Sequence, residues 1–513
     1  MRTLIQGGWV VGFDGRSHQL FRDGTLVFED DVVLEVGHTF EGRADRTIDA
    51  RGMLIMPGLI NAHLHLGTNA PHVFFLDETK ADYFGSNFYA YSVPRRGAPD
   101  ARAATRADVE QLYGLWAALR GGATTIMDIG SRNAVALVGV IGELGARAYV
   151  GPSFKSYSYT FDEAGRIQWD PDPASGEAGL RRAIEFAREY DGAHDGRVRC
   201  MLYPAQLDTC SVDLLKATRK AADENGLRIS LHAAMNLIEF HRILREHGRT
   251  PLQLLHDIGF LGHDVLLGHC VFHAHHSWAH FPYVEDLRLV ADSGASVAHA
   301  PYKYAKMGIL LESFERYRRL GINVALGTDT FPQDLIAEMR LAGLMCRFAE
   351  GSFRVGKASE VFDAATLGGA RALGRDDLGR LAPGARADIV LVDLRGAHFG
   401  AVHDPIKSLV EYASGSDIDT VIVDGRTLIE RGRAVALDER ALLDRVQESG
   451  EQAWASTADW HWNHATTDEI APMSYPLAAR DKTFGRQAAH RPRPRSAGLH
   501  ATDLSDVRGR QAL

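Results

Sequence analysis

The sequence predicts an α/β protein, with a (β/α)8 TIM-like metallo-barrel and a small β-sandwich domain formed from both chain ends. Three observations lead to this fold class. Eight apolar runs of strand length alternate with helical periodicity between residues 54 and 379. Short runs of β-favouring residues, interrupted by Gly and Asp, flank that region on both sides. Histidine or aspartate residues stand at the ends of five of the eight runs.

The two β-rich flanks are expected to form one domain. Residues 1–53 contain short β-rich runs, and the same texture returns at 386–393 and at 419–426, where Asp424-Gly425 marks a turn. A single sandwich built from both ends is the simplest arrangement of these runs. We therefore expect residues 1–53 plus 380–440 to form the β-sandwich domain, 54–379 the barrel, and 441–513 a C-terminal helical segment with an extended tail.

The eight apolar runs are assigned to barrel strands in chain order. They cover residues 54–60, 124–129, 148–154, 198–203, 228–232, 265–269, 296–299 and 323–327. Helical periodicity follows most of them, at 109–119, 180–190, 212–224, 310–320 and 335–348. Nearly continuous apolar runs are typical of parallel strands that are buried on both faces. A doubly wound open sheet is the alternative arrangement of the same units.

Composition and charge indicate which kinds of molecule the protein is expected to bind. The 513 residues carry a net charge of −9 and are 45% hydrophobic, which is typical of a soluble globular protein without a nucleic-acid or anionic-membrane partner. No apolar stretch reaches the roughly 18 residues of a spanning helix, and the N-terminus lacks a signal-peptide pattern. The four scattered cysteines favour a reducing compartment. We expect a cytoplasmic protein that acts on a small molecule.

Two regions have an irregular texture. Residues 68–101 follow the first barrel strand and are rich in aromatic side chains, which is consistent with a substrate lid or with a packing segment. Residues 441–470 have a helical pattern, whereas 471–513 are rich in Pro, Arg and Ala. That tail is expected to be a solvated extension or an arm on a neighbouring subunit.

The histidine pair His63-Leu64-His65 is the first sign of a metal site. Side chains at i and i+2 of a strand point to the same face, so both imidazoles can reach one point beyond the strand end. Chemistry in a (β/α)8 barrel takes place at the carboxyl ends of the strands. Further ligand-type residues end strands 5, 6, 7 and 8, namely His232, His269, His299 and Asp329.

Imidazoles combined with a carboxylate suit one borderline divalent ion, either Zn2+ or Fe2+. Such an ion lowers the pKa of a bound water towards neutrality and polarises the bond to be cleaved. Asp329 can both bind the ion and accept the proton of the water, and His269 can orient the water or stabilise developing charge.

At these residues the chain resembles the amidohydrolase superfamily. The matching segments are residues 57–65, 121–128, 231–232, 267–270, 327–329 and 379–390. The resemblance is greatest to the branch of triazine hydrolases, cytosine and guanine deaminases, and methylthioadenosine/S-adenosylhomocysteine deaminases. It implies a barrel flanked by a β-sandwich, a homodimer or homotetramer, and one metal ion held by His63, His65, His232 and Asp329. It implies a catalytic role for His269.

Metal count and substrate contacts follow from the remaining strand ends. Two-metal members of the family bridge their ions with a Lys or Glu from strand 4, whereas strand 4 here ends in Tyr203-Pro-Ala-Gln206. One metal ion is therefore expected. Gln206, Lys155 and His299 are candidate substrate-binding residues. The loop histidines at 273–280 are a weaker candidate for a second metal site, because no carboxylate or cysteine accompanies them in the pattern.

One departure from the family pattern bears on the reaction. Related deaminases carry Glu three residues after the strand-5 histidine, where this chain has Met235. Glu239 is a possible substitute, and a solvated carboxylate on a helix face is the competing interpretation. We expect a hydrolase that cleaves a C–N bond of amino, amide or urea type, or a C–Cl bond, in a small N-heterocyclic or ureide-like substrate. The alternatives are a purine, pyrimidine or triazine deaminase, a lyase or isomerase, and a metal-free binding protein.

Overall fold

The computed structural model describes residues 1–67, 69–76, 94–98, 106–309 and 311–478. The chain divides into two units, Met1–Pro472 and Met473–Leu513. All described helices and strands belong to the first unit, and residues 473–478 of the second contain neither. Within the described ranges, no helix combines the length and the apolar character needed to span a membrane.

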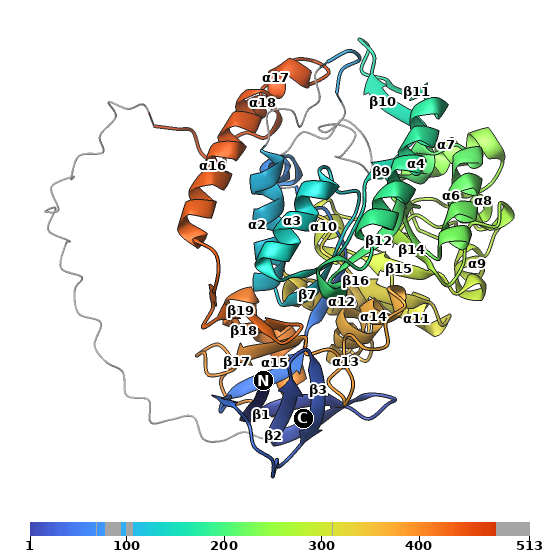
Figure 1. The fold of residues 1–513 in the computed structure, drawn as a ribbon. Helices are drawn as coiled ribbons and strands as arrows, with labels where there is room; N and C mark the ends of the chain where they lie inside the picture. The colour runs from blue at the N-terminus through green and yellow to red at the C-terminus, as the bar shows by residue number, and fades with distance from the viewer. Residues whose placement is uncertain (68, 77–93, 99–105, 310, 479–513) are drawn as a thin grey trace, which may run out of the picture. The chain divides into compact units, whose positions relative to one another are not determined.

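Eight parallel strands form the predicted barrel (Figure 1). Each strand pairs with its sequence neighbour in the set, and a parallel bridge between Leu64 and Asp329 joins the last strand region to the first. The short β9 (Ser153–Phe154) also pairs with the fourth strand. The strands are β6 (Leu59–Leu64), β7 (Ala123–Asp128), β8 (Arg147–Val150), β12 (Val198–Pro204), β13 (Arg228–Ala233), β14 (Val265–His269), β15 (Ser296–His299) and β16 (Asn323–Leu326).

Amphipathic helices connect the barrel strands, as the periodicity predicts. Several begin at side-chain caps, such as Ser211 before α6 and Asp334 before α12. The helix expected at 310–320 is shorter, because Ser313 caps its first turn and α11 begins at Phe314. The main connecting helices are α2 (Ala107–Arg120), α3 (Ala134–Leu144), α4 (Pro173–Tyr190), α6 (Val212–Asn225), α7 (Leu237–His247), α8 (Pro251–Asp257), α9 (Asp286–Ser293), α10 (Pro301–Lys306), α11 (Phe314–Arg319) and α12 (Leu335–Glu350).

Both chain ends contribute to a second, mixed sheet of nine strands. Its central contact is the antiparallel pair of β5 (Met53–Pro57) and β17 (Ile389–Asp393), which joins the N-terminal strands to the C-terminal ones. The other strands are β1 (Arg2–Phe13), β2 (His18–Glu29), β3 (Val32–Gly37), β4 (Arg46–Asp49), β18 (Ile418–Val423), β19 (Arg426–Glu430) and β20 (Arg433–Ala434). A separate β domain formed from both ends agrees with the prediction, whereas its exact boundaries stay a prediction.

The apolar run expected as one barrel strand, 54–60, is instead shared between the two sheets. Its first part is β5, and the barrel strand β6 begins only at Leu59. The break occurs at Gly58, whose N–H donates to the Asp388 carbonyl, while the Leu59 N–H donates to the Gly122 carbonyl. Periodicity cannot reveal this change of partner, because both halves are equally apolar and equally buried.

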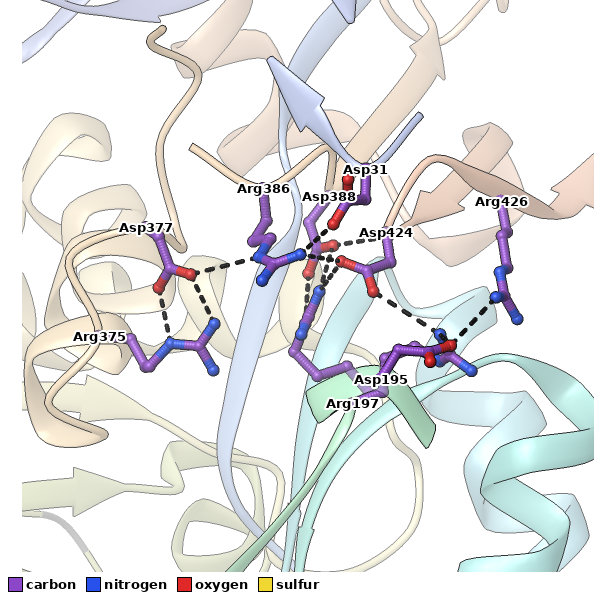
Figure 2. Close-up of polar contacts among 10 residues, drawn as sticks. Asp31, Asp195, Arg197, Arg375, Asp377, Arg386, Asp388, Asp424 and Arg426 are labelled. Carbon is purple, nitrogen blue, oxygen red and sulfur yellow. Dashed lines mark hydrogen bonds and ion pairs between the residues drawn. The ribbon is translucent and has the colours of Figure 1, made fainter. Parts of the chain in front are cut away.

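A buried ion network joins the barrel to the mixed sheet (Figure 2). Arg147, the first residue of β8, donates from Nε and Nη2 to the two oxygens of Asp388 at 3.1 Å each. The same Nη2 donates to Asp424 at 2.7 Å. Arg197 and Arg386 approach Asp424 from either side. These contacts fix the end of the barrel opposite the carboxyl ends of the strands.

The expected C-terminal helical segment is present as α16 (Glu439–Ala455), α17 (Thr457–Trp460) and α18 (Thr467–Ile470). It packs beside α2, and the Trp454 indole donates to the Ala70 carbonyl at 2.8 Å. Most of the aromatic segment predicted as a lid, residues 77–93 and 99–101, lies outside the described residues. The greater part of the predicted tail, 479–513, also lies outside them.

Candidate functional site

His63 lies at the centre of a histidine cluster. It belongs to β6 and is fully buried, and its ring is 4.6 Å from His269 and 4.9 Å from His232 between centroids. Glycines on two other strands leave room for it. A Cβ at Gly268 would lie 2.5 Å from the His63 Cε1 atom, and one at Gly327 would lie 2.6 Å from the His63 carbonyl oxygen.

His65 and His232 present the same ring nitrogen to the cluster. The Nδ1 atom of His65 bonds to the Ile129 carbonyl at 2.9 Å, and that of His232 bonds to the Ala205 carbonyl at 2.6 Å. A carbonyl can only accept, so each Nδ1 carries the proton and each Nε2 keeps its lone pair. The two Nε2 atoms lie 3.1 Å apart. The bonds from Nδ1 to the two carbonyls fix the orientation of both imidazoles, as is usual for metal ligands.

Asp329 brings a carboxylate to the same point. Its Oδ1 is 3.8 Å from the His63 Nε2 and 3.5 Å from the His65 Nε2, whereas its Oδ2 is 3.7 Å from the His269 Nε2. The backbone is tied to the first strand, since the Asp329 N–H donates to the His63 carbonyl and the His65 N–H to the Asp329 carbonyl. Both Asp329 and His269 have positive φ, 56° and 81°, which is uncommon for residues with a side chain.

These polar atoms are buried without ordinary partners. Both ring nitrogens of His63 and of His269 lack hydrogen bonds within the described chain, and neither Asp329 oxygen accepts one, although Lys303 forms an ion pair with Oδ2. Unsatisfied buried groups are costly unless a ligand satisfies them. Two sets have ligand atoms within 4.8 Å of one another and so could hold a metal ion: His63, His65 and His232, and His63, His269 and Asp329.

Burial sets the charge of the cluster. It lowers the pKa of His63 and His269 well below the usual value of 6.5, so both are neutral. Burial alone would raise the pKa of Asp329, but the Lys303 ammonium group outweighs it and holds that pKa well below 3.8. An ionised carboxylate surrounded by neutral imidazoles is the donor set that a divalent cation requires.

Lys303 is the site residue that sequence reasoning missed. It lies on α10, two residues after Pro301, and its Nζ forms an ion pair with the Asp329 Oδ2. Its side chain is only 12% exposed. The sequence held a partial signal, because Lys303 lies four residues after His299, near the carboxyl end of a barrel strand, but its contact with Asp329 depends on how α10 packs.

The three predicted substrate-binding residues occupy different positions. Gln206 is buried beside His232, with which it forms a β-bridge, and it accepts a hydrogen bond from the Tyr159 hydroxyl at 2.9 Å. Lys155 is exposed and lies 5.5 Å from the centroid of the Tyr159 ring. His299 is buried outside both metal-ligand groups and lines a cavity with Tyr304. Their roles toward a substrate stay predictions.

The turn after β13 corrects the interpretation of Glu239 as a solvated carboxylate. Glu239 is fully buried, and its two oxygens accept from the N–H groups of Ala234 at 2.6 Å and Met235 at 3.1 Å. Burial, reinforced by Asp208, raises its pKa well above 4.5. Glu239 thus holds the turn in place. Met235 fills the position of the family's acid, with its sulfur 3.8 Å from the Gln206 amide nitrogen.

A cavity adjoins the cluster on the side of His65. It has about 420 Å3 of empty space, counting its open mouth, and its lining includes His65, Glu110, Asp128 and Arg132. Asp128, the last residue of β7, has a structural contact there, since its Oδ1 accepts from the Leu66 N–H at 3.0 Å. The loop histidines at 273–280 belong to none of the possible metal-ligand groups in the described part of the chain.

Comparisons with known proteins agree with this geometry. The model of the family described as "Amidohydrolase family" matches residues 54–428. The 5-methylthioadenosine/S-adenosylhomocysteine deaminase of Thermococcus onnurineus is 31% identical over 434 residues, covering 84% of this chain and 94% of that protein. The 5'-deoxyadenosine deaminase of Methanosarcina acetivorans is 28% identical over 453 residues, covering 88% and 98%.

Two solved structures have a fold similar to that of this chain. An adenosine deaminase from Xanthomonas campestris with bound zinc has a TM-score of 0.73 at 22% identity, covering 88% of this chain and 98% of that one. The atrazine chlorohydrolase of Arthrobacter aurescens, complexed with zinc, has a TM-score of 0.69 at 24% identity, covering 87% and 100%.

Proposed function

The chain belongs to the amidohydrolase family, and from that premise we propose that it is a metal-dependent hydrolase of a carbon–nitrogen bond in a small molecule. One set of contacts supports the proposal: the Asp329 Oδ1 lies 3.8 Å from the His63 Nε2 and 3.5 Å from the His65 Nε2, and the His65 Nε2 lies 3.1 Å from the His232 Nε2. The Nδ1 atoms of His65 and His232 bond to backbone carbonyls.

The four residues His63, His65, His232 and Asp329 would hold one divalent ion, either Zn2+ or Fe2+. Zinc is the first candidate, because solved structures of similar fold hold zinc. When bound, such an ion lowers the pKa of water and polarises the bond under attack. The Asp329 Oδ1 lies toward His63 and His65 and its Oδ2 toward His269, which supports a role in which Oδ2 would take the proton of the water and pass it to the leaving group. His269 would orient the water.

The reaction subclass has two candidates. The names of the relatives support an aminohydrolase of an adenosine derivative, and the zinc-bound neighbours include a triazine enzyme. The apolar Met235 at the position of the family's acid, and the engagement of Glu239 with backbone N–H groups, support hydrolysis of an amide, urea or comparable bond instead. A metal-free binding protein is the third possibility. Location in the cytoplasm and assembly into a homodimer or homotetramer also stay predictions.

The test compares metal content and turnover in matched variants. His63→Ala and Asp329→Ala should lose at least a thousandfold in kcat/KM while retaining the wild-type circular dichroism spectrum. His247→Ala removes an exposed histidine and serves as the control. Ammonia release from 5'-deoxyadenosine, methylthioadenosine, an aminotriazine and N-carbamoyl compounds is measured with zinc- and iron-loaded enzyme. Wild-type protein that retains no metal, or a His63→Ala variant with full activity, would refute the proposal.

A further inference from the structure

Lys303 brings an ammonium group into the proposed metal centre. Its Nζ contacts the Asp329 Oδ2, on the side of the carboxylate that faces His269 rather than His63 and His65. At 12% exposure its side chain is nearly buried, yet it still reaches accessible space. Asp329 is the one carboxylate in ion-pair contact with Lys303 within the described part of the chain.

A second lysine adds to this charge. Lys306 lies three residues later on α10 and therefore shares a helical face with Lys303. Its Nζ donates to the Phe331 carbonyl at 3.3 Å, and it forms no ion pair with a described carboxylate. Glu338 on α12 is fully buried and accepts from the Tyr302 N–H at 2.9 Å.

The charges do not balance once a divalent ion is bound. The ion and Lys303 together carry three positive charges, against one negative charge on Asp329, and the neighbouring imidazoles are neutral. A buried excess of positive charge is costly unless an anion compensates it. Among the described residues near the cluster, the Gln206 amide nitrogen donates toward the Met235 sulfur, and Met235 offers no acid. The carboxylates in the cavity beside His65, Asp128 and Glu110, accept from backbone N–H groups.

We propose that Lys303 binds an anionic oxygen of the substrate, so that this enzyme acts on small molecules with a carboxylate close to the C–N bond that is cleaved. An ammonium group donates charge-assisted hydrogen bonds to a carboxylate, and such bonds are about twice as strong as neutral ones. Lys306, on the same helix face, raises the positive potential that attracts the anion. This inference rests on the proposed function, because the excess charge arises when the metal ion is bound.

The experiment measures binding with a pair of probes that differ in one charge. N-carbamoylglycine carries a carboxylate, whereas N-carbamoylglycinamide is its neutral counterpart. Calorimetric titration of zinc-loaded protein gives Kd for both probes with wild type, Lys303→Met and Lys303→Arg. Lys407→Met, which removes an exposed lysine, is the control. Metal content by mass spectrometry and circular dichroism are recorded for every variant.

We expect wild type to bind the anionic probe at least tenfold more tightly than the neutral one. Lys303→Met should abolish that preference with unchanged zinc content, and Lys303→Arg should keep most of it. Equal affinity for the two probes in wild type, failure to bind the anionic probe, or a preference that survives in Lys303→Met would overturn the inference. Loss of zinc from the wild type would instead count against the proposed function, so the two failures are distinguishable.

Discussion

The two proposed catalytic residues, Asp329 and His269, are held in their backbone conformation by the surrounding structure. Asp329 and His269 adopt positive φ at the ends of their strands, a conformation that costs on the order of 1–3 kcal/mol for such residues and is concentrated at functional sites. The surrounding bonds from β6 hold Asp329 in that conformation. Sequence alone identified both residues, because residue type at a strand end is local information. It could not identify Lys303 as a partner of Asp329, because that contact depends on where α10 packs.

Buried neutral histidines make the protein sensitive to acid. Burial lowers the pKa of His273 to about 3, and its Nδ1 accepts from the His275 N–H at 3.2 Å. Below pH 6.5 the unfolded chain protonates this residue and the folded chain does not, so stability falls as pH falls. Between pH 7 and pH 5 the loss from His273 is about 2 kcal/mol.

Urea unfolding of metal-free protein at both pH values measures this loss. His273→Gln should lose that much less stability on acidification than wild type, while His247→Gln, at an exposed position, should follow wild type. An identical pH dependence in wild type and His273→Gln would contradict the assignment.

At the scale of elements, the site depends on the seam between the first and last barrel strands. Asn61 on β6 makes reciprocal bonds with Thr328, donating to its hydroxyl at 2.9 Å and accepting from its N–H at 3.1 Å. These bonds hold the segment that carries Asp329. Helical and strand periodicity predicted the elements on both sides of this seam. The division of run 54–60 between two sheets was not predictable, because it is decided by hydrogen-bond partners about 60 residues away for Leu59 and about 330 residues away for Gly58.

Weakening this seam should weaken metal binding. Asn61→Ala removes both bonds to Thr328 and so loosens Asp329, and we expect metal affinity to fall by about 10–100-fold, as for other residues that support metal ligands. Competition with a chelator measures the affinity. Asn323→Ala is the matched control, since Asn323 donates to Ser296 and Gly368 at the opposite end of β16. A larger effect from Asn323→Ala than from Asn61→Ala would exclude this role of the seam.

At the scale of the whole molecule, the two sheets are joined through charge as well as through apolar packing. Arg147, Asp388 and Asp424 are all nearly fully buried, and Arg147 lies more than 200 residues from both aspartates along the chain. Burial acts against the charge of Arg147, but the two carboxylates outweigh it and raise its pKa above the usual value. The exposed pair of Arg426 and Asp195 lies at the edge of the same network (Figure 2).

Breaking the centre of this network should destabilise the fold without changing the chemistry. Arg147→Met leaves two buried carboxylates without their main partner, and we expect a loss of about 3–5 kcal/mol in the free energy of unfolding. Arg426→Met should cost less than about 1 kcal/mol, because that ion pair is exposed to solvent. Chemical denaturation gives both values, and the folded Arg147→Met protein should keep the wild-type kcat. Equal losses of unfolding free energy in the two variants would show that burial of the network contributes nothing to stability.

The sequence by itself determined the barrel, the β domain made from both ends, and the identity of the ligand-type residues at the strand ends. Each depends on short-range patterns: an apolar run, a helical period, or a histidine two positions after another. The tertiary structure decided which side chains meet. The ion pair of Lys303 with Asp329, the burial of Glu239 against backbone N–H groups, and the tautomers of His65 and His232 all arise from long-range packing. No local pattern encodes those distances, because they are set by elements that come together only when the barrel closes.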